Sequence, residues 1–246
     1  DRIPVSAPAG ETAANNMVWQ RVGHVGWTWT FGEAIEMGNL LADLPAPPTS
    51  SCTDAKLFFS EYAEGSSSNK YLEIYNAGSC AANLDDYAFP STSNGGDTLG
   101  EHYYWNTFPA GATIAPGAVY IIAHGSADAT IVDQAAMLHP YLSNGDDGYC
   151  LVKGTEASYT IVDCIGDWQA DPGGGWDVCG TAEGTKDHTL VRKSTVTGGN
   201  GGDWAASAGT DAFDCEWVVL PQDEWNNRGS HPHPGICANL LFSEYA

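Results

Sequence analysis

Residues Leu57 to Asn76 read LFFSEYAEGSSSNKYLEIYN, and the rest of the predicted architecture is built around them. The two ends of this stretch, Leu57–Tyr62 and Tyr71–Asn76, are rich in apolar and aromatic residues, which suit a pleated, half-buried surface. Small polar residues separate the two ends, as in a chain reversal. The stretch therefore predicts two neighbouring β-strands joined by a short loop.

Three charged residues interrupt the apolar character of these strands: Glu61, Lys70 and Glu73. Lysine is uncommon here, because the chain has 9 Lys and Arg against 31 Asp and Glu. The three could be taken for acid–base machinery. A lone lysine among carboxylates on apolar strands is more simply a part-buried ion pair that fixes the loop. The expectation is therefore a structural ion pair.

The first strand of the hairpin recurs near the other end of the sequence. Leu240–Ala246 reads LLFSEYA, and its Ser243–Ala246 repeats Ser60–Ala63 residue for residue. Each copy follows a cysteine, Cys52 or Cys237. Such a recurrence predicts a tandem array of modules. We therefore expect the chain to be an internal segment of a longer series, with Cys237 an inter-repeat cysteine.

Cysteine usage predicts disulfides. Seven cysteines are present, so an even set remains for one module when Cys237 is set aside. The absence of a C-x-x-C motif argues against zinc and favours an oxidising, extracellular compartment over free thiols in a cytosolic protein. Several connectivities are open. The first pair flanks the opening strands, the second lies on neighbouring strand candidates and the third follows by elimination: Cys52–Cys80, Cys150–Cys164 and Cys179–Cys215.

Short strand candidates continue along the chain, separated by turn clusters rich in Gly, Asn, Asp and Pro. After the opening hairpin they are Ala82–Tyr87, Val119–His124, Gly148–Val152, Thr160–Ile165, Thr189–Lys193 and Glu216–Leu220. Ile131–Leu138 is the one plausible helical turn between them. Many short strands with this punctuation predict an all-β sandwich.

The motifs of this region also carry a family resemblance. They are FFSEYAEGSSSNKYLEIYN, ATIAPGAVYIIAHGSADA, NGDDGYCLV, IVDCIGDW, DPGGGW, TKDHTLVRK and DAFDCEWVV. Together they resemble the lamin tail domain, in the version found in secreted bacterial proteins, often beside extracellular nucleases. The resemblance covers about Leu57 to His231 and implies an immunoglobulin-like β-sandwich without catalytic residues of its own. It does not cover residues 1–50, and no nuclease-like segment is present.

These signals divide the chain into a sandwich and its flanks. Residues 52–230 form the predicted sandwich, between Pro-rich linkers at 45–51 and 231–236. Residues 237–246 begin the following repeat, and residues 1–44 are an N-terminal extension or the end of a preceding module.

Each flank carries a more specific expectation. In the N-terminal extension, Val18–Phe31 predicts one or two strands and Glu33–Leu44 a short helix. The aromatic strands should be paired, either within their own chain or by strand addition to another copy. The first linker places Thr49, Ser50 and Ser51 beside prolines, a setting for O-glycosylation in secreted stalks.

Paired carboxylates are too frequent to identify a metal site by themselves. Asp146 and Asp147 in NGDDG read as a turn rather than as ligands. The better calcium candidates lie on a loop leaving a strand and in a Gly-rich stretch. They are Asp163, Asp167, Asp171, Asp203, Asp211 and Asp214.

Aromatic residues suggest one further site. Trp168 and Trp176 flank the DPGGG loop and form the predicted exposed pair for stacking on sugar rings. Other tryptophans read more simply as packing residues. No G-x-S-x-G motif and no histidine with plausible triad partners is found, so no catalytic residue is predicted.

The formal charge of −22 argues against nucleic-acid partners, because a phosphate backbone would be repelled. No apolar run is long enough to insert into a membrane. No cofactor is required, although calcium is possible. The leading hypothesis is a non-catalytic, extracellular or cell-surface module whose partners are other copies of itself, in a filament, appendage, sheath or adhesin. The alternatives are an accessory domain of a secreted nuclease or phosphatase, and a carbohydrate-binding adhesion module.

Overall fold

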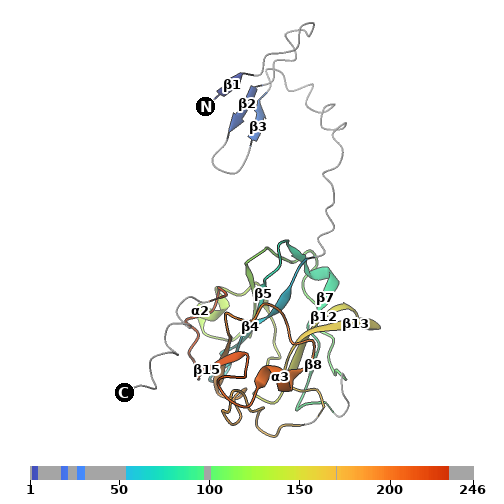
Figure 1. The fold of residues 1–246 in the computed structure, drawn as a ribbon, viewed down its shortest axis with the longest axis vertical. Coiled ribbons are helices and arrows are strands. Elements are labelled where there is room, and N and C mark those ends of the chain that lie inside the picture. The colour runs from blue at the N-terminus through green and yellow to red at the C-terminus, as the bar shows by residue number, and fades with distance from the viewer. Residues whose placement is uncertain are drawn as a thin grey trace. The chain divides into compact units, whose positions relative to one another are not determined.

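The computed structural model describes residues 54–96, 101–169 and 171–232, together with three N-terminal strands. The chain divides into two compact units, Asp1–Ser51 and Cys52–Ala246. Figure 1 traces both units along the chain, and each is described by itself.

The N-terminal unit contains an antiparallel sheet in the order β1-β2-β3. Its strands are β1 (Arg2–Pro4), β2 (Val18–Arg21) and β3 (Trp27–Thr30). Of the one or two strands expected within Val18–Phe31, two form, β2 and β3, and they pair with each other, with Trp19 opposite Trp29. The helix expected over Glu33–Leu44 lies outside the described residues.

A six-stranded sheet organises the second unit, in the order β11-β10-β5-β4-β14-β15. The repeated sequence forms β4, which lies inside this sheet between β5 and β14 (Figure 1). The strands are β4 (Leu57–Glu64), β5 (Lys70–Asn76), β10 (Val119–Ala123), β11 (Met137–Leu138), β14 (His188–Arg192) and β15 (Trp217–Pro221).

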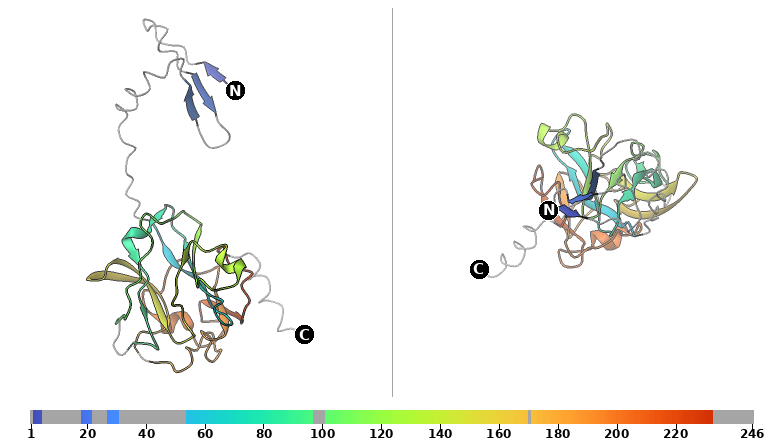
Figure 2. Two further views of the ribbon diagram at one scale, coloured as in Figure 1. Left: turned by 180° about the vertical axis from the view of Figure 1, so that it is seen from behind. Right: turned by 90° about the horizontal axis from the view of Figure 1, so that it is seen from above.

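The second layer is a smaller sheet in the order β13-β12-β7, with β8 also paired to β12. Its long hairpin, β12–β13, extends beyond the rest of the unit as a two-stranded ribbon (Figures 1 and 2). The strands are β7 (Tyr87–Ala88), β8 (Ser91–Thr92), β12 (Gly148–Thr155) and β13 (Ser158–Ile165), and a separate pair is formed by β6 (Ala82–Asn83) and β9 (Thr113–Ile114).

The main core lies between the two sheets. Leu57 and Phe59 of β4 and Leu72 and Ile74 of β5 pack there with Leu151 of β12. Residues two apart on a strand share a face, so these side chains all point toward the smaller sheet. The expected sandwich therefore follows from period-two patterning on the central strands.

The opposite face of the six-stranded sheet is also covered. Ala63, Tyr71 and Ile121 form a second cluster with Ile131 of α2 (Ala129–Val132) and the partly buried Trp225. Because both faces are covered, β4 is buried along its whole length. This double burial explains why apolar residues stand at successive positions of β4, as in Leu57, Phe58 and Phe59, instead of alternating with polar ones.

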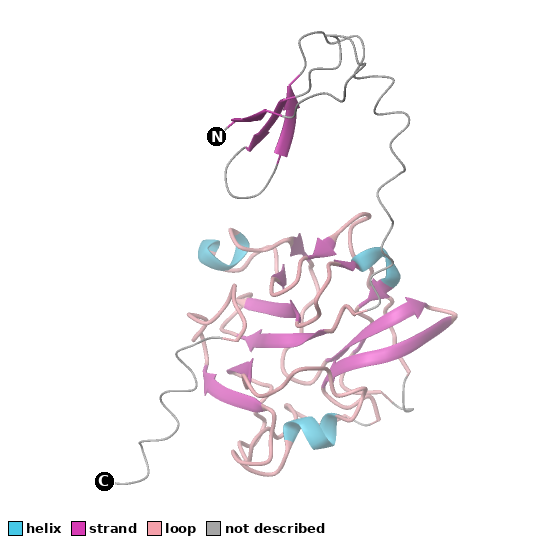
Figure 3. Cartoon of the chain, turned by 45° about the horizontal axis from the view of Figure 1, so that its top comes forward, coloured by secondary structure: helices cyan, strands magenta, loops and turns pink. Residues whose placement is uncertain are grey.

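Helical turns in the described residues are confined to three short segments, η2 (Leu84–Asp86), α2 and α3 (Trp204–Ala208) (Figure 3). The strand expected over Ala82–Tyr87 is interrupted by η2, because the Asn83 side chain accepts a hydrogen bond from the Asp85 amide. The helical turn expected over Ile131–Leu138 is wrong in its bounds: Asp128 caps α2 at Thr130 so that it covers Ala129–Val132, and Met137–Leu138 form β11.

The predicted second linker begins inside the folded unit. His231 is only 8% exposed, and its ring packs edge-on against Phe58 and Tyr75, with ring centroids 5.5 and 4.9 Å away. Burial lowers the pKa of His231 to about 4, so this imidazole is neutral at physiological pH.

Candidate functional site

Glu61 and Glu73 lie opposite each other on β4 and β5, and both are almost completely buried. The Tyr71 hydroxyl donates to the Glu61 carboxyl group, and the Ser60 hydroxyl donates to Glu73 Oε1 over 2.7 Å. Burial and the neighbouring Glu73 charge raise the pKa of Glu61 to about 8. Glu61 therefore keeps its proton at neutral pH. Since neither carboxyl reaches solvent, the pair cannot act on a substrate.

Lys70 forms its ion pair with Glu64, not with Glu61 or Glu73. The strand register explains this correction, because Glu64 and Lys70 lie directly opposite each other at the loop end of the hairpin. The second oxygen of the Glu64 carboxylate accepts a hydrogen bond from the Asp187 amide over 2.5 Å. The predicted ion pair thus exists with a different acidic partner, and it ties the hairpin to the segment before β14.

The loop between β4 and β5 is held by two further side chains. Asp223 accepts hydrogen bonds from the amide and the hydroxyl of Ser66, over 2.8 and 2.7 Å. Asn69 Oδ1 accepts from the Asp128 amide over 2.8 Å. Nearby, the Tyr62 hydroxyl donates to a backbone carbonyl, that of Thr185. Many polar residues of this hairpin make hydrogen bonds or ion pairs within the module, among them Ser60, Glu61, Tyr62, Glu64, Ser66, Asn69, Lys70, Glu73 and Asn76.

A buried ion pair joins the two sheets. Asp163 and Arg192 have fully buried side chains, with Arg192 Nη2 3.2 Å from Asp163 Oδ1. Asp163 also accepts hydrogen bonds from the amides of Phe59 and Asn200. The guanidinium carbon lies 4.4 Å from the centroid of the Trp217 ring. Sequence analysis missed Arg192 and assigned Asp163 to calcium, although the charge of Asp163 is already compensated by arginine.

The other calcium candidates accept hydrogen bonds from nearby backbone amides. Asp203 caps α3, and Asp167 and Asp171 each accept from the amide two residues on. Asp211 and Asp214 bond the turn that contains them, and those bonds lower the pKa of Asp214. Among the described residues, no group of three or more His, Cys, Asp or Glu side chains could hold a metal ion.

Two of the predicted cysteine pairs are disulfides. Cys150 and Cys164 lie opposite each other on β12 and β13, with Cα atoms 4.0 Å apart. Cys179 and Cys215 are joined with a Cα separation of 5.2 Å. The first bond crosses the long hairpin, and the second ties the segment before β14 to the segment before β15.

The predicted exposed tryptophan pair is not exposed. Trp168 is 3% exposed, and Trp176 is partly buried against the main core. Glycines make this burial possible, because a Cβ at Gly148 would lie 2.8 Å from the Trp168 ring and one at Gly166 would lie 2.7 Å from the Trp176 ring. The two indoles therefore lie against bare backbone and offer no platform to a sugar.

A hollow of about 500 Å³ lies on the surface of this unit. It is bordered by the β4–β5 loop, by β8 and by the segment that precedes β12. The serine hydroxyls on its wall belong to Ser67, Ser68 and Ser93, whereas Ser91 and Thr92 line it as buried residues. Such a wall offers both donors and acceptors of hydrogen bonds.

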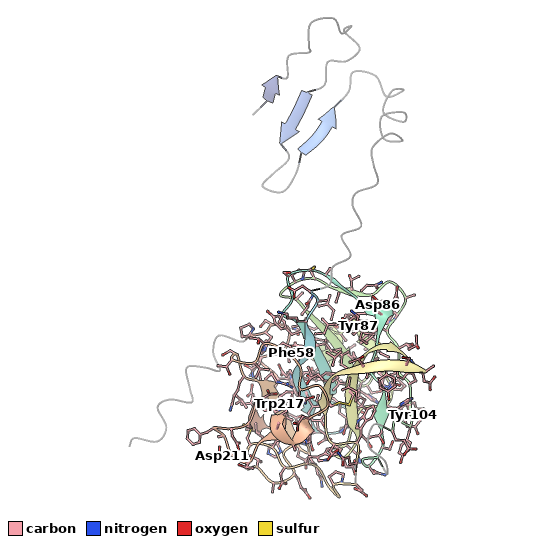
Figure 4. All side chains as sticks on the ribbon, turned by 45° about the vertical axis from the view of Figure 1, so that its right-hand side comes forward. Phe58, Asp86, Tyr87, Tyr104, Asp211 and Trp217 are labelled. Carbon is pink, nitrogen blue, oxygen red and sulfur yellow. A yellow bond between two sulfur atoms is a disulfide. The ribbon has the colours of Figure 1, made fainter. Side chains whose placement is uncertain are left out.

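Two tyrosines border this hollow, Tyr104 with 59% and Tyr141 with 80% of its surface exposed. Figure 4 shows Tyr104 at the periphery of the unit, in contrast to the interior Trp217. Neither tyrosine was among the predicted binding residues, which were Trp168 and Trp176. The run EHYYW, in which three aromatic residues cannot all point inward, was the available signal.

Some predicted sites fall outside the described residues. Cys80 is disulfide-bonded, but its predicted partner, Cys52, lies outside the described residues. So do Cys237 and the O-glycosylation candidates Thr49, Ser50 and Ser51.

Residues 50–166 match the sequence profile of the Lamin Tail Domain, a non-enzymatic, immunoglobulin-like domain family. With the observed sheets, this match confirms the predicted immunoglobulin-like β-sandwich with disulfides. No curated protein and no solved structure matches the chain. The matched stretch ends just after β13, yet β14 and β15 continue the six-stranded sheet beyond β4. In the described residues, no helix has the length and apolarity needed to cross a membrane.

Proposed function

We propose that this chain supplies a non-catalytic structural module to an extracellular tandem-repeat protein that forms a filament, surface appendage, sheath or adhesin. The observation that carries the proposal is the internal use of the repeated motif. Ser60, Glu61 and Tyr62 are buried and hydrogen-bonded within the sandwich, so the motif encodes the fold of a module rather than a site for a ligand.

Because the first copy of the motif is buried in the sandwich, its second copy at Ser243–Ala246 suggests that the same fold is encoded again. A motif that serves a surface site could recur for many reasons. The side chains of this motif make hydrogen bonds to Glu73, Tyr71 and Thr185, and these partners are present only where the same sandwich forms. Its recurrence supports a second module of the same fold in series.

An extracellular setting is supported by covalent bonds. The chain has two disulfides, Cys150–Cys164 and Cys179–Cys215, and disulfides form and persist in oxidising compartments. Rigid sandwiches with such cross-links resist proteases and transmit tension along a series. O-glycosylation of the linker residues Thr49, Ser50 and Ser51 belongs to the same proposal.

Contact between copies needs an exposed apolar feature, and Phe213 is the best candidate. Its side chain is 89% exposed. The turn that presents it is fixed, because Asp211 accepts hydrogen bonds from the amides of Phe213 and Asp214, and Cys215 follows in a disulfide. Figure 4 shows Asp211 at the outer edge of the unit. A rigidly held phenylalanine can insert into a neighbouring copy without a large loss of entropy.

The test is self-association of the oxidised chain, measured by sedimentation velocity over a range of concentrations and by negative-stain electron microscopy. We expect concentration-dependent oligomers with a regular axial repeat. Phe213→Ser should weaken the association about tenfold, whereas Leu138→Ser, at another exposed position, should not change it. A protein that stays monomeric at every concentration would refute assembly through this module.

The accessory-domain alternative is distinguished by the rest of the polypeptide and not by the activity of this chain. Nuclease and phosphatase assays with added divalent metal should detect no turnover by this chain alone under either proposal. A metal-dependent hydrolase encoded in the same polypeptide would favour the accessory role, whereas further SEYA-containing modules would favour the tandem series.

A further inference from the structure

The hollow beside the β4–β5 loop is not used by the structural role proposed above. Its volume of about 500 Å³ is in the range of small-molecule sites. Hydroxyl groups form one part of its wall and tyrosine rings form another. We propose that this hollow is a binding site for a neutral saccharide.

The tyrosines supply the apolar contact that a sugar requires. One face of a pyranose ring presents mainly C–H groups, which pack well against an aromatic face. Tyr104 and Tyr141 are both more than half exposed and border the same hollow. Each also carries a phenol oxygen that can bond a sugar hydroxyl. Two such residues can hold successive residues of an oligosaccharide.

The backbone beneath both rings is already fixed. The Tyr104 amide donates to the Ser91 carbonyl over 3.1 Å, and the Ser91 amide donates back to the Tyr104 carbonyl over 3.0 Å. The Tyr141 carbonyl accepts a hydrogen bond from the buried Tyr149 hydroxyl over 2.9 Å. Binding therefore orders few further degrees of freedom, which favours affinity for a small ligand.

The electrostatics of the hollow disfavour an anionic ligand. The ammonium group of Lys70 is paired with Glu64 and leaves no uncompensated charge for an anion. Asp147 adds a carboxyl to the wall, and the whole chain has a formal charge of −22. Anionic sugars are repelled on both grounds. The hydroxyl groups of Ser67, Ser68 and Ser93 match a neutral polyol instead.

The experiment is a titration of the oxidised full chain with soluble neutral tetrasaccharides, followed by isothermal calorimetry and by saturation-transfer NMR. Cellotetraose, maltotetraose, xylotetraose and mannotetraose provide different hydroxyl patterns on the same scale. A tetragalacturonate and a tetralysine peptide are the charged probes. Variants are Tyr104→Ala, Tyr141→Ala and the control Tyr103→Ala, which is exposed but lies outside the lining of the hollow.

We expect at least one neutral tetrasaccharide to bind, with affinity reduced about tenfold or more by Tyr104→Ala and by Tyr141→Ala and unchanged by Tyr103→Ala. Unchanged melting temperatures would show that the variants remain folded. The proposal is overturned if no neutral probe binds, if only a charged probe binds, or if all three variants weaken binding equally. Because binding is measured on the single chain, the result does not depend on whether copies assemble.

Discussion

Replacing Glu61 with glutamine isolates the buried acid pair, because glutamine keeps the size and the acceptor oxygen of the side chain but cannot ionise. The pKa of Glu61 is about 8 in the folded protein, against its ordinary value of 4.5. Between these pH values the folded state holds a proton that the unfolded state releases. The contribution of Glu61 to stability is therefore fully present below about pH 4.5 and is lost as the pH rises toward 8.

The size of the effect follows from the width of this window. Each pH unit within it changes the free energy of unfolding by about 1.4 kcal/mol. At pH 7 the accumulated loss is on the order of 3 kcal/mol, which a glutamine avoids while it still accepts the bond from Tyr71. We expect Glu61→Gln to match the wild type near pH 4.5, to exceed its stability by on the order of 3 kcal/mol at pH 7, and to gain nothing further above about pH 8.

The assay is urea denaturation of the oxidised protein, followed by tryptophan fluorescence at a series of pH values between about 4.5 and 9. The matched control is Glu101→Gln at an exposed position, which should stay within about 0.5 kcal/mol of the wild type at every pH. A Glu61→Gln protein that is less stable than the wild type at pH 7, or a difference that does not grow with pH, would show that Glu61 is ionised in the folded state.

Three other substitutions test the remaining contacts by the same denaturation. Arg192→Met should cost about 3–5 kcal/mol, because it leaves the buried Asp163 carboxylate without its counter-charge; a loss below about 1 kcal/mol would contradict the pairing. Replacing Cys179 and Cys215 together by serine should cost about 3–4 kcal/mol, because the bond closes a loop with a sequence separation of 36; an unchanged midpoint would count against the bond. Asp223→Ala should cost about 1 kcal/mol and speed hydrogen exchange in the β4–β5 loop, because two bonds to Ser66 are lost; unaltered exchange in that loop would be inconsistent with the clamp.

The pattern of apolar and polar residues along the sequence predicted those parts of the fold that form between neighbouring segments. The Leu57–Asn76 hairpin was evident because its apolar residues and its polar loop lie within one short stretch. The pairing of Cys150 with Cys164 was accessible for the same reason, since the two residues occupy neighbouring strands of one hairpin. Residues 131–138 were less tractable, because the Asp128 cap moves the helix toward the N-terminus by a contact that hydrophobic periodicity does not record.

The candidate site was harder to predict, because the fold brings its residues together from distant parts of the sequence. Asp163 and Arg192 meet only because β4 brings Phe59 beside β13 and pairs with β14. The orientation of Trp168 depends on the missing side chain of Gly148, a contact across the smaller sheet. Composition can show that carboxylates and indoles are abundant. It cannot show which of them the fold removes from solvent.

The small number of Lys and Arg residues determines which forces can hold two copies of the chain together. Lys70 and Arg192 are paired with carboxylates inside the unit, and the whole chain has a formal charge of −22, so negative charge dominates between two copies. Copies should therefore repel one another until salt shortens the range of the field, which is about 10 Å at about 0.1 M. We expect self-association measured by sedimentation to strengthen as NaCl rises from about 0.02 to 0.5 M, as contact through an apolar group such as Phe213 requires. Equal ionic strengths of CaCl₂ and NaCl separate screening from a specific calcium bridge. If added NaCl instead dissociates the oligomers, the contacts are ionic and the apolar interface is refuted.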